Sequence, residues 1–479
     1  MSATAATAPD LAPEHRLPPA SVEARLEQVE AFGAHVNEAI NSLVDTILEL
    51  KARDGASAEV EALRTKLAQI EQQLNQERTA RELAEISQIH PKERRVVFVG
   101  GAHFGDNTKY AWQALRERAG AMGVECWFMP HDAAQEALVR GLGGDCFPGA
   151  PEQWSDADVT RALGTAVLVI HDHLLHPNPL APSLFAGARV VQLWHGISIK
   201  EVGLRNLPPL KNFSPRVARI LRTCGRFASF VGGSRADEGN WRRWFSFERY
   251  APIGFPRNDV MHREPSAADL VNVDEALLER MRATRRAGQR VFFYAPTFRD
   301  ADRGRWLLDA GLERVAKGVA ASGDLLVMNL HPVEQSMQPQ LEQALPGVVF
   351  VRPRSDIYPL MRETDALVTD YSSLMFDYLH LDRPIVLFRP DHASYIAKSR
   401  KLYDAKLAEL PGPMVATAQA LVEVLKHCDK RCGAPFKAAR DQLAAQLFDH
   451  IDGRAAERVV ELIGAELETA LARQAQGWT

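Results

Sequence analysis

The sequence predicts two α/β lobes, each built on a parallel sheet, with an α-helical extension in front of them. Short apolar runs alternate with helix-length segments from Pro91 onward, and a second series of the same kind begins near Tyr250. A heptad pattern of apolar residues precedes both series. The 479 residues exceed what one hydrophobic core holds, since single cores stop growing at about 250–300 residues.

The N-terminal segment divides into a tail and a heptad region. Residues 1–20 are rich in Ala and Pro and are predicted to be a disordered tail. Residues 21–88 are predicted to form a coiled coil, with one apolar seam over 22–50 and a second over 60–74, out of phase by one residue. We expect these seams to join copies of the chain into a homo-oligomer. A helical hairpin that folds back on the body is the alternative.

The first lobe is predicted to span residues 89–250 and to be Rossmann-like, because its apolar runs are continuous, as in strands buried on both faces. The predicted strands are Arg95–Val99, Val124–Met129, Ala166–Ile170, Ala188–Leu193 and Phe227–Val231.

The second lobe is predicted to span residues 251–430, followed by C-terminal helices over 431–479. Helices over about 414–427 and 435–475 are expected to close the second lobe and to cross back to the first. Ligands of such sheets bind at the carboxyl ends of the strands, so the site is expected there. The predicted strands are Arg290–Tyr294, Leu325–Asn329, Val348–Val351, Ala366–Thr369 and Ile385–Phe388.

Composition narrows the function class. A hydrophobic fraction of 46% and a charged fraction of 25% are typical of globular protein, and a net charge of −4 gives no reason to expect a nucleic-acid partner. The five scattered cysteines favour reduced thiols in the cytoplasm over disulfides or a zinc site. No signal peptide and no bilayer-spanning stretch is predicted, so any membrane contact is expected to be peripheral.

In the first lobe the candidate chemistry follows the strand at 188–193. His195 and Gly196 come directly after this strand, and an imidazole at a strand exit can accept a proton near neutral pH. Lys200 follows about one turn later and offers positive charge to an anionic substrate on the acceptor side. A packed histidine that caps the strand is the alternative.

In the second lobe, cationic and polar residues follow other strands. Arg257 lies in a Gly- and Pro-containing junction and suits either a phosphate clamp or a structural salt bridge. Thr297 and Arg299 follow Pro296, which ends a strand, and Arg299 suits a diphosphate. His331 follows the next strand and is a second histidine at the expected site.

The strongest local pattern is the turn from the strand at 366–369 into a helix. Ser372 and Ser373 lie at the start of that helix, where free backbone N–H groups and hydroxyls favour an anion. An ordinary helix cap that binds nothing is the alternative. Asp370 is expected to orient its neighbours or to bind a sugar hydroxyl, because an ionised carboxylate only accepts hydrogen bonds.

Two further clusters of residues are expected to have structural roles and not to bind a ligand. The segment Asn240–Phe247 combines aromatic residues with arginine, and helix packing is favoured there over contact with a membrane or a lipid-linked acceptor. His171, His173 and His176 crowd one strand end with Asp172, but neighbours on a short strand exit point in different directions. No metal site is therefore predicted.

Taken in order over about 95–465, these segments resemble the CDP-glycerol glycerophosphotransferase family of teichoic-acid and capsule polyol-phosphate transferases. Each motif is weak alone, and their order makes the resemblance specific. The matching segments are Trp194-His195-Gly196 with Lys200 and Gly203, Gly254–Asp259, Tyr294–Arg299, His331-Pro332, Asp356–Tyr358, Thr369–Ser373 with Asp377, Asp391 with Tyr395, and Asp452–Arg454.

The resemblance implies a GT-B fold and transfer of a polyol phosphate, glycerol phosphate above all, from a CDP-linked donor, with release of CMP. It implies no metal and no cofactor besides the donor substrate. It also implies work at the cytoplasmic face of the membrane on a hydroxyl of a polymeric or lipid-linked glycan, of a capsule, surface-glycan or teichoic-acid type.

The resemblance also assigns roles to residues. His195 would deprotonate the acceptor, and His331 would be the second catalytic histidine. The remaining assigned residues would bind the donor phosphates or nucleotide: Arg257, Thr297, Arg299, Asp370, Ser372, Ser373 and Asp377. Two other readings stay open, an NDP-sugar glycosyltransferase on the same fold and a non-catalytic coiled-coil scaffold.

Overall fold

The computed structural model describes residue 42 and residues 57–149, 157–174, 180–199, 202–205, 227–299, 305–398 and 410–475. The chain divides into two compact units, Met1–Thr79 and Ala80–Thr479. The predicted tail and nearly all of the first heptad seam lie outside the described residues, as does Lys200.

The second heptad seam lies on one long helix, α2 (Ser57–Ile89). Along it Leu63, Leu67, Ile70 and Leu74 are half-buried, while the residues between them are exposed. The spacing of three and four residues places these four side chains on one face of the helix, and the coiled coil itself stays a prediction. The last turns of the helix belong to the larger unit, where Leu83 packs on the first lobe and the Ser87 hydroxyl donates to the Leu184 carbonyl at 2.7 Å.

The first lobe is a seven-stranded sheet in the order β3-β2-β1-β4-β5-β6-β7, with every described pairing parallel. The strands predicted from apolar runs are present. The short β3 and the edge strand β7 were not predicted, because Glu248 and Arg249 interrupt the apolar run in β7 and are exposed. The strands are β1 (Glu93–Val99), β2 (Glu125–Met129), β3 (Asp145–Cys146), β4 (Ala166–His171), β5 (Arg189–Gln192), β6 (Phe227–Val231) and β7 (Phe247–Ala251).

The second lobe is a six-stranded sheet in the order β10-β9-β8-β11-β12-β13, again parallel throughout its described pairings. The helix predicted over 414–427 begins only at Ala418, because Met414 and Val415 extend the sheet as its last strand. The strands are β8 (Val291–Ala295), β9 (Leu325–Met328), β10 (Val348–Phe350), β11 (Ala366–Thr369), β12 (Ile385–Phe388) and β13 (Met414–Val415).

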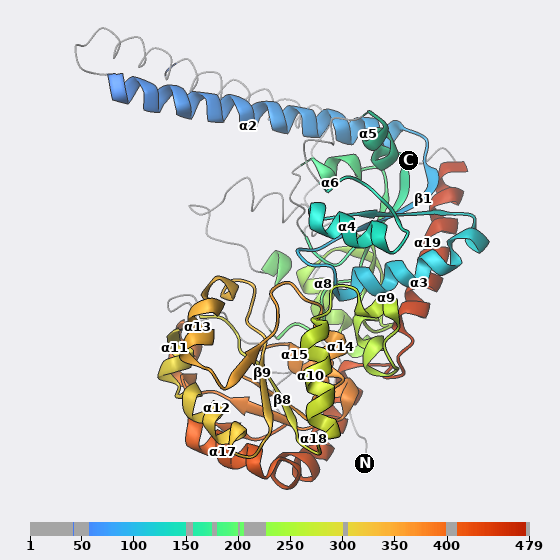
Figure 1. Cartoon of the computed structure of the whole chain (residues 1–479). Helices are drawn as coiled ribbons and strands as arrows, with labels where there is room; N and C mark the ends of the chain where they lie inside the picture. The colour runs from blue at the N-terminus through green and yellow to red at the C-terminus, as the bar shows by residue number, and fades with distance from the viewer. Residues whose placement is uncertain are drawn as a thin grey trace, which may run out of the picture. The chain divides into compact units, whose positions relative to one another are not determined.

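Helices cover both faces of the second sheet, which is why its strands are continuous apolar runs. Val291 and Phe293 point into a core shared with α10 (Glu275–Arg286), α14 (Tyr358–Met361) and α15 (Leu374–Asp377). Phe292 and Tyr294 point to the opposite face. That face is covered by α11 (Arg305–Asp309), α12 (Leu312–Ala320), α13 (Gln338–Ala344) and α17 (Ala418–Lys426), with α12 and α17 side by side in Figure 1.

The last helix of the chain is part of the first lobe. α19 (Ala455–Ala475) packs Val459 and Ile463 into the core between the first sheet and α3 (Asp106–Met122). Its buried Glu466 accepts from Arg189 Nε at 2.8 Å and from Ser229 Oγ at 2.7 Å. The other face of this sheet is covered by α5 (Ala157–Gly164) and α6 (Ala181–Leu184).

The helix predicted over 435–475 is in fact two helices, α18 (Lys437–Leu447) and α19. They are separated by a turn in which Gly453 adopts φ +69°, a left-handed conformation that a helix interior does not allow. The other described helical segments are α4 (Ala133–Gly141), α8 (Glu238–Trp244), α9 (Ala267–Leu270), α16 (His392–Lys398), η2 (Gly203–Arg205), η4 (Arg235–Asp237), η5 (Pro256–Met261), η6 (Gln335–Met337), η7 (Tyr378–Leu381), η9 (Asp429–Gly433) and η10 (Ala434–Phe436).

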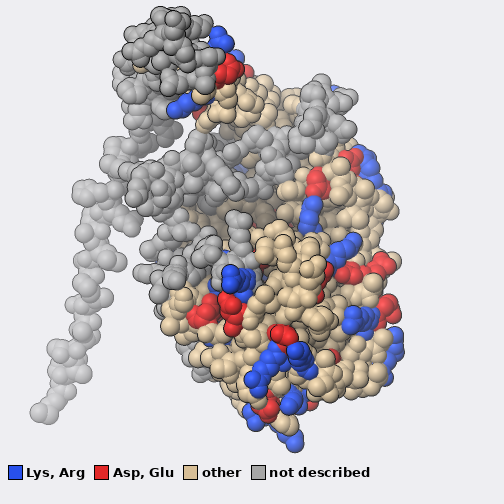
Figure 2. All heavy atoms as spheres, turned by 60° about the vertical axis from the view of Figure 1, so that its left-hand side comes forward, with Lys and Arg blue, Asp and Glu red and all other residues tan. Residues whose placement is uncertain are grey.

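The surface carries charges of both signs. On the face in Figure 2, Lys and Arg lie beside Asp and Glu over the described part of the chain, with uncharged residues between them. Among the described helices, none is both long enough and apolar enough to span a bilayer.

Candidate functional site

The first half of the site is the turn after β5. Trp194 adopts φ +54° and Gly196 φ +100°, so the backbone reverses sharply on either side of His195. A tryptophan in the left-handed region is strained, and hydrogen bonds hold it there. Its N–H donates to Gln192 Oε1 at 2.8 Å, and its carbonyl accepts from Asn107 Nδ2 at 2.8 Å.

The hydrogen bond of His195 assigns its tautomer. Nδ1 lies 3.1 Å from the carbonyl oxygen of Asp172. A carbonyl only accepts, so Nδ1 carries the proton and the lone pair is on Nε2. Although the residue is exposed, desolvation of the ring by its surroundings and the nearby His173 lower the pKa of His195 to about 4. The imidazole is therefore a neutral proton acceptor at pH 7.

Arg257 connects this turn to the second lobe. Its buried guanidinium donates from Nη1 to Asp106 Oδ1 at 2.7 Å, and from Nη2 to Asp377 Oδ2 at 2.7 Å and the His195 carbonyl at 2.9 Å. Arg257 holds the pKa of Asp106 well below its usual range despite burial, while burial keeps the pKa of Asp377 raised. Protein oxygens occupy both ends of the guanidinium, as the structural interpretation of this segment expects.

Gly196 leaves the space that this ion network fills. A Cβ atom on Gly196 would lie 2.2 Å from Arg257 Nη2 and 3.6 Å from Asp377 Oδ2. The turn that carries His195 therefore contacts α15 of the second lobe, whose first turn follows Ser372 and Ser373.

The second half of the site centres on Arg299. Its Nε and Nη2 bind both oxygens of Asp391, at 2.7 and 2.9 Å, and Nη2 lies 2.9 Å from Asp370 Oδ2. Its guanidinium carbon lies 4.1 Å from the ring centre of Trp306 and 4.5 Å from that of Tyr395. The two carboxylates raise the pKa of Arg299, although burial opposes this, so its charge is permanent.

Asp370 orients the surrounding segments. It is fully buried, and its Oδ1 accepts from the backbone N–H groups of Thr297 at 2.9 Å and Tyr371 at 2.5 Å. Ser372 Oγ caps the N–H of Leu374 at 3.3 Å. Within the described part of the chain, no hydrogen bond engages the half-buried hydroxyl of Ser373 or the buried one of Thr297.

His331 has the opposite tautomer to His195. The backbone N–H of Val333 donates to its Nδ1 at 3.3 Å, so the proton of the neutral ring is on Nε2. Its ring packs on Phe298 with centroids 4.5 Å apart, which joins it to the Thr297–Arg299 segment. Within the second lobe the structure thus brings Thr297, Arg299, Asp370, Ser372, Ser373 and His331 into one connected set.

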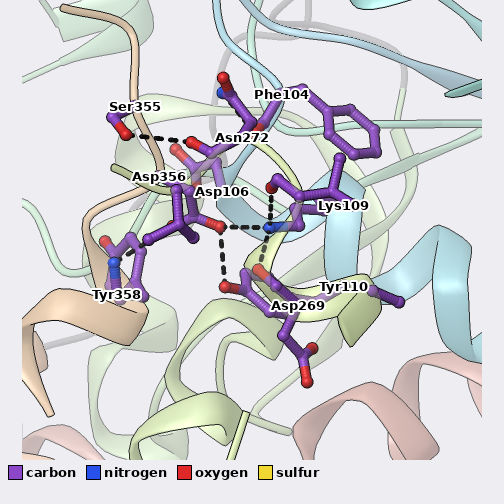
Figure 3. Close-up of polar contacts among 12 residues, drawn as sticks. Phe104, Asp106, Lys109, Tyr110, Asp269, Asn272, Ser355, Asp356 and Tyr358 are labelled. Atoms are coloured by element: carbon purple, nitrogen blue, oxygen red, sulfur yellow. Dashed lines mark hydrogen bonds and ion pairs between the residues drawn. The ribbon is translucent and has the colours of Figure 1, made fainter. Parts of the chain in front are cut away.

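A buried joint links the two lobes beside the site. Lys109 on α3 is fully buried and donates to Asp356 Oδ2 at 2.7 Å and to the Asp269 carbonyl at 2.6 Å (Figure 3). Tyr110 also donates to Asp356 Oδ2, at 2.8 Å. A buried charge left without its partner costs several kcal/mol, about 3–5 in measured cases, so this joint holds α3 firmly against the second lobe.

Sequence reasoning missed one arginine at the site. Arg389 follows β12, is 5% exposed, and donates from Nε to the Asp370 carbonyl at 3.0 Å. Burial lowers its pKa, and its Nη2 has no hydrogen-bond partner among the described residues. Its position directly after an apolar run, before Pro390, was the signal available in the sequence.

The helix-packing interpretation of the 240–247 segment is supported. Trp241 and Trp244 of the 240–247 segment are buried in an aromatic cluster with Phe230 and Phe245, as helix packing requires. The described residues contain no group of three or more His, Cys, Asp or Glu side chains placed to hold a metal ion; His176 lies outside them.

The architecture is that of two parallel-sheet α/β lobes in a GT-B-like arrangement. A solved structure of the wall teichoic acid polymerase TagF superimposes with a TM-score of 0.63 at 20% identity, over 86% of this chain and 99% of that one. A likeness at this level of identity shows the shared fold.

The family follows from the sequence match. The model of the CDP-Glycerol:Poly(glycerophosphate) glycerophosphotransferase family matches residues 85–465, so the chain belongs to this family. It is 23% identical to a teichoic acid poly(glycerol phosphate) polymerase of Staphylococcus epidermidis over 90% of this chain, and spans 59% of that relative's length. It is 25% identical to a teichoic acid glycerol-phosphate transferase of Staphylococcus aureus over 57% of this chain and 70% of the relative.

Proposed function

We propose that the chain transfers a polyol phosphate, glycerol phosphate above all, from a CDP-linked donor to a hydroxyl of a surface-glycan, capsule or teichoic-acid-type acceptor. The family membership and the names of its relatives support this reaction class. The relatives include enzymes named as polymerases and one named as a glycerol-phosphate transferase, and the chain covers only part of the polymerases.

One observation carries the proposal. The Arg257–Asp377 ion pair joins the turn of His195 to the helix that follows Ser372 and Ser373. A proton acceptor from the first lobe is thereby held near an anion-compatible turn of the second. This is the arrangement that phosphoryl transfer needs, because that chemistry depends on positioning and on stabilising charge.

The proposed step uses the two histidines differently. His195 Nε2 takes the proton as the acceptor hydroxyl attacks the donor phosphorus bonded to the polyol. A new P–O bond forms, the bond from that phosphorus to the CMP oxygen breaks, and CMP leaves with the electron pair. His331 Nε2–H, Arg299 and the hydroxyls of Ser372 and Ser373 stabilise the charge on the phosphoryl oxygens. Lys200 is proposed to steer the acceptor.

Two further proposals concern the oligomeric state of the chain and its location in the cell. The apolar stripe on α2 suits a coiled coil, and we propose that residues 21–88 join copies of the chain into a homo-oligomer. We also propose a cytoplasmic location, with peripheral contact at the inner face of the cell membrane where a lipid-linked acceptor is reached.

A donor panel tests the function. The purified chain is incubated with CDP-glycerol, CDP-ribitol and several UDP-sugars, each with an acceptor extract that a known family enzyme elongates. Release of CMP from a CDP-polyol, dependent on the extract, is the expected result. Release of UDP with no CMP would instead support the glycosyltransferase, and no turnover of any donor would favour the scaffold.

A further inference from the structure

An ion pair lies directly beside His195 at the end of β4. His173 Nδ1 donates to Asp172 Oδ1, and the Asp172 carboxylate is fully buried. The other oxygen, Oδ2, accepts from the backbone N–H and the hydroxyl of Thr108, both at 2.9 Å. The first turn of α3 therefore fixes the carboxylate that holds His173.

The same residue holds both imidazole rings. The backbone carbonyl of Asp172 accepts from His195 Nδ1, and its carboxylate binds His173. The two rings stack with centroids 5.3 Å apart and planes 20° apart. A Cβ on Gly101 would lie 2.7 Å from the His173 ring. The ring therefore packs directly against the backbone of Gly101, where a side chain would not fit.

His173 carries a positive charge in this setting. Burial opposes the charge, but Asp172 outweighs it and raises the pKa of His173 to about 9. The ring is therefore an imidazolium at neutral pH. A unit charge about 5 Å away, at an effective dielectric of roughly 20–40, moves a neighbouring pKa by roughly one to two units.

Other charged and titratable groups face the two rings. Asp106 raises the pKa of His195, while Arg257 lowers it with a charge that Asp106 and Asp377 balance. His103, His131 and His171 are also nearby, and burial lowers the pKa of each, so they are neutral at pH 7. Asp356 faces His103 from the second lobe. Among the nearby imidazoles, His173 is thus the charged one.

We propose that the Asp172–His173 ion pair is a positioning device for His195. It fixes the plane of the ring and places a cation against it, while the Asp172 carbonyl keeps the proton on Nδ1 and leaves Nε2 to accept one. The proposal rests on the role of His195 as base. It gives a use to a histidine cluster that the sequence presents as a crowded strand end.

The test is a histidine titration by NMR on the full-length protein labelled at histidine Cε1, with the His195 signal assigned from His195→Gln. His173→Gln removes the charge but keeps a polar side chain. His103→Gln is the matched control, because it removes a neutral imidazole that follows the adjacent strand β1 and lies close enough to His173 to feel its charge. In the wild-type protein, the titration of the His173 signal gives the charge state of His173 directly. The test therefore holds even if a variant does not fold.

The expected sign follows from the loss of a cation. In His173→Gln the pKa of His195 rises by about one unit or more, so the acid limb of kcat/KM moves to higher pH by the same amount. His103→Gln leaves both unchanged. An unshifted His195 signal in His173→Gln, an equal shift in His103→Gln, or a wild-type His173 that is neutral at pH 7 would overturn the proposal. The NMR experiment tests the role of His173 and not the role of His195 as the base. The role of His195 fails only if His195→Ala keeps its turnover.

Discussion

The two halves of the site are built on opposite electrostatic principles. In the first lobe His195 is neutral, exposed, and held by a strained turn with Trp194 and Gly196 in left-handed conformations. In the second lobe Arg299 carries a permanent charge, already engaged by Asp370 and Asp391. One half thus offers a neutral imidazole, and the other holds a cation that is already paired with carboxylates, which fits the proposed roles of base and donor-binding half.

The largest effect is expected from the first half. His195→Ala should lower kcat by about 10²–10⁴-fold, the range that a general base contributes, because no other lone pair replaces Nε2. Rates of CMP release with saturating donor and acceptor extract measure this. His427→Ala, which removes the exposed histidine that follows α17, should leave kcat unchanged. A rate within a few-fold of wild type in His195→Ala would end the assignment of the base.

A second prediction concerns the turn itself. Gly196→Ala should lower the free energy of unfolding by about 2–4 kcal/mol, since the new Cβ meets Arg257 and φ is +100°. Arg257 cannot move aside without losing its bonds to Asp106 and Asp377. Gly239→Ala on α8 has nothing within 4 Å of its new Cβ and should change stability by less than about 1 kcal/mol. Equal urea midpoints for the two variants would show that the turn tolerates a side chain.

A smaller effect is expected from the donor-side hydroxyls. The double change Ser372→Ala and Ser373→Ala should weaken donor binding about tenfold or more, because a hydrogen bond to a charged phosphate is worth about 1.5–3 kcal/mol and the loss of one such bond already weakens binding about tenfold. Calorimetric titration with CDP-glycerol measures the affinity. The exposed pair Ser322→Ala and Ser336→Ala serves as the control. Unchanged affinity in the first variant would make the turn an ordinary helix cap.

The smallest effect on turnover is expected from the extension. Deletion of residues 1–79, which keeps Leu83 and Ser87 on the first lobe, should lower the oligomer number seen by light scattering and leave kcat close to wild type. An unchanged oligomer number would favour the hairpin alternative. A large loss of turnover would show that the extension contributes to the site.

Much of the sheet architecture was predictable, because strands buried on both faces are continuous apolar runs. β7 was not, since Glu248 and Arg249 face solvent at the sheet edge. Nor was the break between α18 and α19, where a single turn containing Gly453 interrupts an otherwise helical pattern. The pattern of apolar residues in the sequence therefore predicts strands that are buried on both faces, but it does not predict edge strands or short turns between helices.

The sequence points to individual residues of the candidate site but not to how they pair. The sequence points to His195 and Arg257, yet Asp106 and Asp377 lie 151 and 120 residues away from Arg257 and meet it only through the fold. The same holds for Lys109 and Asp356, which are 247 residues apart. In the sequence His173 is only one of several histidines at a strand end, and its stacking on His195 depends on how the two loops fold.

In the proposed mechanism the base lies in the first-lobe half of the site and the donor-binding residues lie in the second-lobe half. Calorimetric titration of two variants with CDP-glycerol, side by side, is the most direct test. We expect His195→Ala to bind CDP-glycerol within about twofold of wild type, and Ser372→Ala with Ser373→Ala to bind it about tenfold more weakly or worse. Loss of donor binding in His195→Ala, together with full binding in the serine variant, would contradict it.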